Sequence, residues 1–226
     1  MSCIIAPLNM TNKPRKTANV GKSVDKLIFG IDEAGRGPLA GPLSVGVFCI
    51  LGTLNVPRAR NIFRSVKESK QLSEAQREAW FSKIESARAA GLVDFSVQFQ
   101  TAQKIDSRGL TRAINEALSS GLKKVLAKNK INPEKCLILL DGGLRAPAHF
   151  KNQKTIIRGD EKKMVIALAS ICAKVLRDRR MRGFAKKYPH YGFEIHKGYG
   201  TRAHYAAIRK HGLTPIHRRS FLRKIL

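Results

Sequence analysis

Short apolar runs along the chain are separated by longer amphipathic segments, and these two patterns predict strands and helices respectively. The short runs are bounded by glycine and polar residues, which is typical of strands that enter a turn or loop. One of them, residues 92–99, alternates between apolar and polar positions, as a strand does when only one face is buried. The predicted strands cover residues 27–31, 43–51, 92–99, 137–140 and 155–157.

Three segments are predicted to be helices, and the second and third have the three- and four-residue apolar spacing of amphipathic helices. A capping box formed by Ser73 and Gln76 starts the first, which is expected to end before Gly91. The second covers about residues 107–128, although a glycine inside it argues against one unbroken helix. The third, residues 161–182, has apolar positions on more than one side, so we expect it to be mostly buried.

This mixture of strands and helices predicts an α/β fold in which a mixed sheet is flanked by helices. The 226 residues suffice for one full domain with its own core. We expect a main domain over residues 27–182 and a small, helical, basic appendage over residues 183–226. Residues 1–26 are basic, and we expect them to form a disordered tail, with a transit peptide as the alternative.

The charge of the chain changes this picture more than its composition does. It has 43 Lys+Arg against 16 Asp+Glu, which gives a formal net charge of +27. Such an excess indicates a polyanionic partner, with nucleic acid ahead of acidic lipid or no partner at all. The last 53 residues, from Lys174 onward, hold 15 of the basic residues and only two acids. The basic surface is therefore expected at the C-terminal end.

Cysteine usage and hydropathy indicate the cellular compartment of the protein. No stretch approaches the roughly 18 to 20 consecutive apolar residues of a membrane helix, and the opening apolar segment is too short for a secretion signal. We therefore expect a cytoplasmic protein with no membrane partner. The cysteines form no C-x-x-C pair, which predicts buried, reduced thiols and makes zinc improbable. The four cysteines are Cys3, Cys49, Cys136 and Cys172.

Carboxylates stand where three of the predicted strands end. Asp32 and Glu33 follow the first strand, Asp141 the fourth, and Asp160 comes shortly after the fifth. Functional groups gather at strand ends, so these acids can converge in one site. Converging carboxylates are stable mainly when cations lie between them. Taken singly, each also fits a structural role: a solvated loop start for the first two, a turn residue for Asp141, and a helix N-cap for Asp160.

Hard divalent cations such as Mg²⁺ or Mn²⁺ prefer carboxylate oxygens of this kind. Two such ions, roughly 3.5 to 4 Å apart, can activate a water molecule and stabilise a leaving oxygen. Together with the basic charge, the acids therefore indicate phosphodiester hydrolysis. The sequence Gly35-Arg36-Gly37 adds a loop whose main chain can approach a ligand closely, with a simple tight turn as the alternative.

Six blocks of residues carry a more specific signal. They are Asp32-Glu33-Ala34-Gly35-Arg36-Gly37, Ser69-Lys70-Gln71-Leu72-Ser73, Asp141-Gly142, Gly159-Asp160, Ala169-Ser170-Ile171-Cys172-Ala173-Lys174-Val175 with Arg177-Asp178, and His196-Lys197-Gly198-Tyr199 with His217-Arg218-Arg219-Ser220-Phe221. In this order they resemble bacterial ribonuclease HII, a type 2 ribonuclease H. The resemblance implies a ribonuclease H-like fold and endonucleolytic cutting of the RNA strand in RNA/DNA hybrids, or of a single ribonucleotide in duplex DNA. It also implies ribonucleotide excision repair and DNA replication as the context.

The resemblance further implies roles for individual residues. The acids Asp32, Glu33, Asp141 and Asp160 match the catalytic, metal-binding set of a two-metal site for Mg²⁺ or Mn²⁺. The loop Gly35-Arg36-Gly37 matches the one that reads the ribose 2′-hydroxyl through its backbone. The tyrosine that matches Tyr199 stacks on the sugar of the following deoxynucleotide. Polar positions near backbone phosphates match Ser69, Lys70, Ser170 and Lys174.

Some features lie outside this match. Asp178, inside the long helix, is expected to pair with a neighbouring Arg or Lys. Glu68 stands where the family usually has aspartate, and Arg145-Ala146-Pro147 match more loosely. The C-terminus shows no evident sliding-clamp motif, so we expect a monomer without a protein partner.

Three other readings compete with this one. The first is a non-catalytic basic nucleic-acid-binding protein on the same fold, against which the four intact acids argue. The second is the sister ribonuclease HIII, against which the Gly-Arg-Gly loop and the lack of a sizeable N-terminal domain argue. A transposase-like nuclease on the same fold is a distant third.

Overall fold

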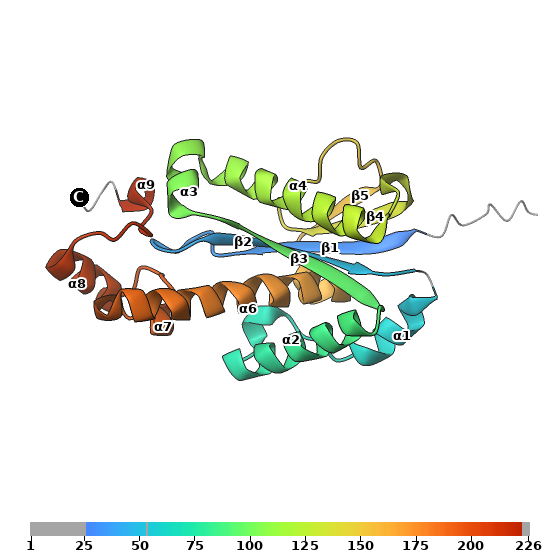
Figure 1. Ribbon diagram of the computed structural model, residues 1–226, viewed down its shortest axis with the longest axis horizontal. Coiled ribbons are helices and arrows are strands. Elements are labelled where there is room, and N and C mark those ends of the chain that lie inside the picture. Colours follow the sequence, from blue (N-terminus) through green and yellow to red (C-terminus); the bar gives the residue numbers. More distant parts are fainter. Residues whose placement is uncertain (1–25, 53, 223–226) are drawn as a thin grey trace, which may run out of the picture.

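Five strands form one mixed sheet at the centre of the molecule (Figure 1). The structure is a computed structural model that describes residues 26–52 and 54–222. The strands are β1 (Leu27–Ala34), β2 (Leu43–Ile50), β3 (Val93–Gln100), β4 (Cys136–Asp141) and β5 (Gln153–Ile156). Their order is β3-β2-β1-β4-β5. The pairs β1–β2 and β2–β3 are antiparallel, whereas β1–β4 and β4–β5 are parallel, which confirms the predicted mixed α/β sheet.

Helices cover both faces of this sheet (Figure 1). They are α1 (Asn55–Ile62), α2 (Glu74–Ala89), α3 (Ala102–Arg108), α4 (Leu110–Asn129), α5 (Gly159–Lys162), α6 (Met164–Lys187), α7 (Phe193–His196), α8 (Arg202–His211) and α9 (Arg219–Leu222), with 3₁₀ turns η1 (Ser69–Gln71), η2 (Pro133–Lys135) and η3 (Pro189–Tyr191). Buried residues of α3 and α4 pack on one face of the sheet. Those of α1, α2 and α6 pack on the other. The sheet is therefore the middle of three layers; β2 is buried along its whole length, whereas the edge strand β5 is partly exposed.

Two glycines allow α6 to lie directly against the sheet. A Cβ added at Gly30 of β1 would overlap the carbonyl group of Val165 and come within 2.6 Å of the nitrogen of Ile166. At Gly46 of β2, an added Cβ would overlap the carbonyl group of Ala169. Only glycine permits so close an approach between a strand and a helix backbone. This approach brings the middle of α6 next to the carboxyl end of β1.

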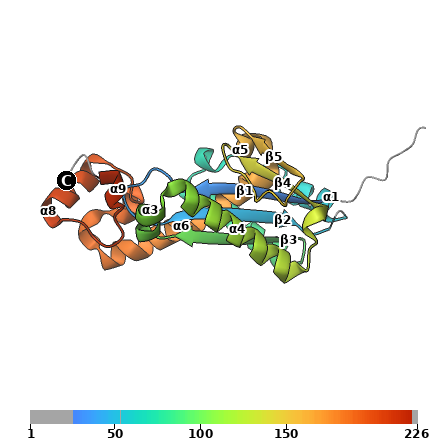
Figure 2. The same ribbon diagram turned by 90° about the horizontal axis from the view of Figure 1, so that it is seen from above.

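The second half of α6 extends beyond the sheet and supports the C-terminal helices (Figures 1 and 2). Met181 of this half packs with Tyr191 and Phe193 in a small apolar cluster that also includes residues of α8 and α9. The C-terminal appendage is helical, as expected. The suggested boundary between residues 182 and 183 lies inside α6, so one continuous helix joins the two parts.

The helix predicted over residues 107–128 is divided at a different glycine from the one that the sequence suggested. Gly109 has φ +81 and separates α3 from α4. Gly121 lies within the unbroken α4, where an added Cβ would come 2.8 Å from a methyl carbon of Val47. The missing side chain at Gly121 therefore serves close packing of α4 on β2 and does not end the helix.

Other helix boundaries were predicted with mixed success. The capping box at Ser73 and Gln76 is present at the start of α2, which confirms that prediction. The long helix begins three residues later than expected, at Met164, because Lys163 is extended and separates it from the short α5. No strand or helix was predicted over residues 52–71, which contain α1 and η1.

The described cysteines are free and buried, as expected: Cys49, Cys136 and Cys172. Burial raises the pKa of the Cys136 thiol to about 11, so this thiol stays protonated at neutral pH. Cys3 and nearly all of the predicted tail lie outside the described residues. Within residues 26–52 and 54–222, no helix has both the length and the apolar character needed to cross a membrane.

Candidate active site

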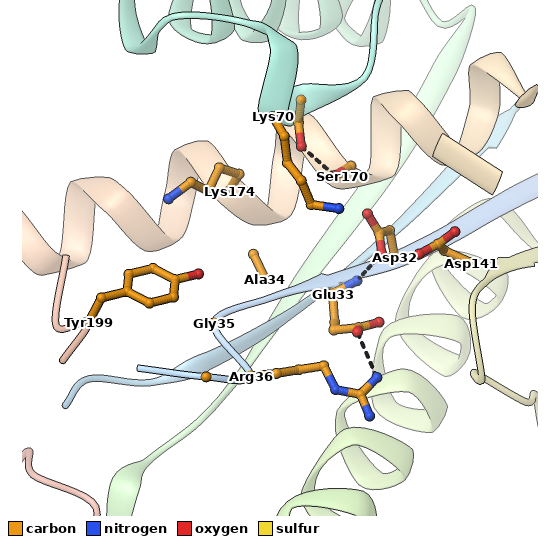
Figure 3. A pocket seen from close by; sticks show the side chains of 12 residues that line it. Asp32, Glu33, Ala34, Gly35, Arg36, Lys70, Asp141, Ser170, Lys174 and Tyr199 are labelled. Atoms are coloured by element: carbon orange, nitrogen blue, oxygen red, sulfur yellow. Dashed lines mark hydrogen bonds and ion pairs between the residues drawn. The ribbon is translucent and has the colours of Figure 1, made fainter. Parts of the chain in front are cut away.

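A cleft at the carboxyl end of β1 collects most of the residues that the sequence singled out (Figure 3). We call it the carboxylate cleft. Of the predicted site residues, Asp160 alone does not line it. Ala34 lines it without having been predicted. The cleft is lined by Asp32, Glu33, Ala34, Gly35, Arg36, Gly37, Ser69, Lys70, Asp141, Ser170, Lys174 and Tyr199.

The first two acids lie inside β1, which continues to Ala34 and does not end at residue 31 as predicted. Asp32 pairs with Gly46 of β2 in the antiparallel ladder, and it is only 5% exposed, which excludes a solvated loop start. Asp141 is the last residue of β4, which runs parallel to β1. Parallel strands end at the same edge of a sheet, so the predicted convergence of Asp32, Glu33 and Asp141 is confirmed as geometry.

The charge at the centre of the cleft is poorly compensated. Burial raises the pKa of Asp32 well above its usual value, and the charges of Glu33 and Asp141 raise it further. Hydrogen bonds from the hydroxyl of Ser170 and from the Glu33 N–H, which lies 2.7 Å from Asp32 Oδ1, only partly offset these effects. A buried carboxylate beside two others favours the approach of a cation.

Asp160 lies at the edge of this arrangement. It is the second residue of the short α5 and not the N-cap of the long helix, which excludes that structural role. Burial and the charge of Asp141 raise the pKa of Asp160. The amine of Lys70 lies 3.9 Å from Asp160 Oδ2 and 3.3 Å from Glu68 Oε1. Burial alone would lower the pKa of Lys70, but the charges of Asp160 and Glu68 outweigh it and raise the pKa.

The donor set suits a hard divalent cation. Carboxylate oxygens are its preferred ligands, and Glu33 Oε2 is buried without a hydrogen-bond partner among the described residues. In residues 26–52 and 54–222, no three His, Cys, Asp or Glu side chains form a ready-made metal cage. Protein donors hold the acids instead: Arg36 donates to Glu33 Oε1 (2.9 Å), and the N–H of Gly159 donates to Asp141 Oδ1 (2.6 Å).

The raised pKa of Asp32 predicts a pH-dependent stability. Such a carboxyl group favours folding below its unfolded pKa of about 3.9, and this contribution is lost as the pH rises through the raised folded pKa. With a chelator present, we expect Asp32→Asn to raise Tm at pH 7 and to lose this gain toward pH 4. Thermal unfolding of Asp32→Asn and of the wild type between pH 4 and pH 7 measures this difference in Tm.

Asp94 provides the matched control for that experiment. Burial would raise its pKa, but hydrogen bonds from Lys128 and Asn129 outweigh burial and lower the pKa. The ionised form therefore stabilises the fold, and Asp94→Asn should lower Tm at pH 7. A lower Tm for both variants would contradict the interpretation of Asp32.

The remaining polar residues of the cleft are held by one another. The hydroxyl groups of Ser69 and Ser170 are buried and hydrogen-bonded to each other (2.7 Å). Lys174 donates to Asp178 Oδ1 (2.8 Å), and Arg77 lies 3.8 Å from the other oxygen of Asp178. The predicted structural pairing of Asp178 is thus confirmed. Burial lowers the pKa of Lys174, and Asp178 partly offsets this effect.

Two buried arginines contact the glycine loop, Gly35–Gly37. Arg218 donates to the carbonyl oxygens of Gly35 (2.7 Å) and Arg36 (2.8 Å). Gly35 has φ +89, and an added Cβ there would overlap the side chain of Arg177. Arg177 itself donates to the carbonyl of Pro42 (2.9 Å). Both arginines lie in the matched sequence blocks, but a charged residue gives no sequence signal of complete burial.

The fold and the cleft define a class of protein: a nuclease of the ribonuclease H-like fold with clustered acids at the sheet edge. Comparisons agree. Ribonuclease H2 from Pyrococcus horikoshii OT3 superimposes with a TM-score of 0.65 at 31% identity, over 88% of this chain and 96% of that one. Ribonuclease HII of Endomicrobium trichonymphae is 41% identical over 86% of this chain and 84% of its own length. Ribonuclease HII of Clostridioides difficile strain 630 is 40% identical over 88% of this chain and 71% of its own length.

A sequence profile described as Ribonuclease HII matches residues 29–224. The chain belongs to the ribonuclease HII family. It is an endoribonuclease of ribonuclease H type that acts on RNA/DNA hybrids. The family expected from the six sequence blocks is thereby confirmed.

Proposed function

We propose that this chain hydrolyses the phosphodiester on the 5′ side of a ribonucleotide, in RNA/DNA hybrids and at single ribonucleotides in duplex DNA. The products carry 3′-hydroxyl and 5′-phosphate ends. The observation that supports this most is the joint lining of one cleft by Asp32, Glu33, Asp141, the glycine loop and Tyr199. Such an activity fits ribonucleotide excision repair and DNA replication by a monomer in the cytoplasm.

Metal ions would be held by the acidic side of the cleft. Asp32, Glu33, Asp141 and Asp160 supply carboxylate oxygens suited to two Mg²⁺ or Mn²⁺ ions. When bound, two such ions supply an activated water and stabilisation of the leaving oxygen. The charges of both Glu33 and Asp141 act on Asp32, so Asp32 would hold metal together with each of them. Lys70 remains positively charged beside Asp160 and can contact a substrate phosphate.

Ribose recognition would occupy the other side of the cleft. The carbonyl groups of the glycine loop are held by Arg218, so its main chain is fixed before substrate binds. The Tyr199 ring stands beside this loop, since a Cβ added at Gly37 would lie 3.8 Å from Tyr199 Cε1. The 2′-hydroxyl is the group that distinguishes RNA from DNA. A ring packed against the sugar of the next nucleotide disfavours a 2′-hydroxyl on that sugar. The cleft thus fits a ribonucleotide followed by a deoxynucleotide.

A cleavage assay tests this function directly. A labelled DNA duplex that contains one ribonucleotide is incubated with the full chain and Mg²⁺ or Mn²⁺, beside an all-DNA duplex and a long RNA/DNA hybrid. We expect one cut, on the 5′ side of the ribonucleotide, and no cut in the all-DNA duplex. Equal cutting of all three substrates, or none of any, would refute the proposal.

Duplex binding should depend strongly on salt. The exposed cations Arg202 and Arg209 of α8 have no acidic partner within 4.0 Å among the described residues. Each phosphate contact that they make releases counterions, so the double variant Arg202→Gln/Arg209→Gln should lower the slope of log Kd against log salt by about 1 per lost contact. Lys123→Gln/Lys124→Gln, on exposed positions of α4, is the control. Equal slopes for both double variants would exclude α8 from the interface.

A further inference from the structure

Buried histidines lie in the C-terminal appendage next to the Tyr199 loop and outside the carboxylate cleft. His204 in the first turn of α8 is fully buried, and His217 is 3% exposed. The ring of His196, at the end of α7, stacks on that of His204 with 4.5 Å between centroids. Nothing in the proposed chemistry uses these rings. We call His204 and His217 the histidine pair.

A one-way chain of hydrogen bonds runs through the histidine pair to Tyr199. The N–H of Thr214 donates to Nδ1 of His217 (2.9 Å), so the proton of His217 is on Nε2. This atom lies 3.1 Å from Nε2 of His204, which must therefore accept. The proton of His204 is then on Nδ1, 2.9 Å from the carbonyl oxygen of Tyr199, which can only accept. The bonding partners thus assign both tautomers.

The histidine pair is neutral at neutral pH. Burial lowers the pKa of His217 to about 4, with a further contribution from His204. Burial also lowers the pKa of His204. A second proton on His204 would go to Nε2 and place two N–H donors opposite each other across the 3.1 Å contact. A second proton on His217 would go to Nδ1, opposite the N–H of Thr214. Each ring is therefore used at both nitrogens, one as donor and one as acceptor.

A second set of contacts ties the same loop to the start of the cleft. The N–H of Gly198 donates to Nδ1 of His196 (3.2 Å), whose Nε2 bonds the carbonyl of Tyr191 (2.6 Å). The carbonyl of Gly198 accepts from the N–H of Leu39 (2.8 Å), in the segment between β1 and β2. The histidines therefore fix the main chain on both sides of the peptide bond that leads into Tyr199.

The position of the Tyr199 ring depends on this main chain. Tyr199 is 46% exposed, so packing restrains its side chain only in part. The backbone N–H of Tyr199 donates to the carbonyl of His196 (2.9 Å). The backbone carbonyl of Tyr199 accepts from the N–H of Thr201 (2.8 Å) and from the ring of His204. A carbonyl that loses one of its two donors keeps a single, local hydrogen bond across a tight turn. Loss of the His204 bond would therefore let the loop and the ring shift away from the glycine loop.

We propose that His204 and His217 are positioning residues that hold the Tyr199 ring beside the glycine loop and thereby determine the preference for a deoxynucleotide after the cleaved ribonucleotide. This rests on the proposed function, in which the ring packs against the sugar of that nucleotide. When the ring is released, the second 2′-hydroxyl is no longer disfavoured. In long hybrids every following nucleotide is a ribonucleotide, so their cleavage then becomes faster relative to cleavage at single ribonucleotides.

The test is the ratio of kcat/KM for a single-ribonucleotide duplex to that for a duplex of the same sequence with two consecutive ribonucleotides, scored at the first. Because both substrates meet the same folded molecules, the ratio does not change when part of the protein is unfolded. We expect His204→Leu to lower the ratio about fivefold, the size of one neutral hydrogen bond's net contribution. Tyr199→Ala should also lower this ratio.

Two further variants make the test specific. His204→Asn keeps an amide N–H near the Tyr199 carbonyl and should restore most of the ratio. In the double variant His204→Leu/Tyr199→Ala, the ratio should equal that of Tyr199→Ala alone, because the histidine acts only through the ring. A His204→Leu enzyme in which both rates fall equally would overturn the proposal, as would an additive double variant.

A measurement on the unaltered chain covers the case in which His204→Leu fails to fold. Histidine ¹⁵N NMR at pH 7 should show His204 protonated at Nδ1 and His217 at Nε2, both neutral. The opposite tautomer of His204, or a doubly protonated ring, would overturn the proposal. If the wild type cleaves neither duplex, the proposed function itself fails, whereas cleavage with the wrong tautomers refutes only the role of the histidine pair.

Discussion

The Asp32→Asn enzyme is expected to lose cleavage by about a thousandfold or more while its Kd for duplex changes by no more than several-fold. The amide keeps the size of the side chain and can still accept the N–H of Glu33, so the fold of the cleft is preserved. It removes the negative charge at the point where Glu33 and Asp141 lie beside Asp32. Transition-state stabilisation by metal is worth several kcal/mol, whereas duplex binding depends on Lys and Arg.

Single-turnover cleavage of the single-ribonucleotide duplex in Mg²⁺, with duplex binding measured in parallel, checks this prediction. Glu116→Gln is the control, because Glu116 is a half-buried surface acid of α4 that pairs with Arg108 and Arg112 away from the cleft. Its rate should equal that of the wild type. Unchanged turnover in Asp32→Asn would remove Asp32 from the catalytic set, and equal losses of binding and cleavage would indicate a structural role.

Gly30→Ala is expected to have the largest effect on stability, with a loss of about 3 kcal/mol or more in the free energy of unfolding. A Cβ at this position overlaps the carbonyl group of Val165, and backbone atoms cannot move aside as a flexible side chain can. To accommodate it, α6 must separate from β1 along the contact that also positions the cleft. Cleavage per folded molecule should therefore fall as well.

Gly183→Ala is the matched control for Gly30→Ala. Gly183 also lies on α6, but it is exposed and an added Cβ meets nothing within 4 Å. Replacing a glycine with alanine inside an exposed helix should stabilise the fold by about 0.5 to 1 kcal/mol. Chemical denaturation of both variants measures the difference. Equal midpoints would show that the close approach of helix and strand does not limit stability.

Local patterns in the sequence were sufficient where a structure depends on neighbours in the chain. The capping box of Ser73 and Gln76 predicted the start of α2 because both partners lie within one turn. Apolar runs and one alternating segment located all five strands, since each buried face of a strand requires apolar residues. Boundaries were less certain: β1 includes Asp32 and Glu33 because β2 supplies pairing partners beyond the end of the apolar run.

Features that depend on contacts between distant segments could not be derived in this way. No local signal shows that Gly121 packs against Val47, or that Gly109 and not Gly121 divides the helix pair. Likewise, the complete burial of Arg177 and Arg218 depends on carbonyl groups supplied by a loop more than a hundred residues away. Charged residues are rarely buried, so sequence reasoning places them at the surface by default.

By itself, the sequence determined the family, the order of the strands and helices along the chain, and the candidate acids Asp32, Glu33, Asp141 and Asp160. Tertiary structure decided which of these side chains share one cleft, because the parallel pairing of β1 with β4 brings Asp141 beside Asp32. Tertiary structure also forms the histidine pair, since His204 and His217 come into contact only when α8 folds back onto the C-terminal segment. Residue type determines which chemistry is available, whereas packing determines which groups meet.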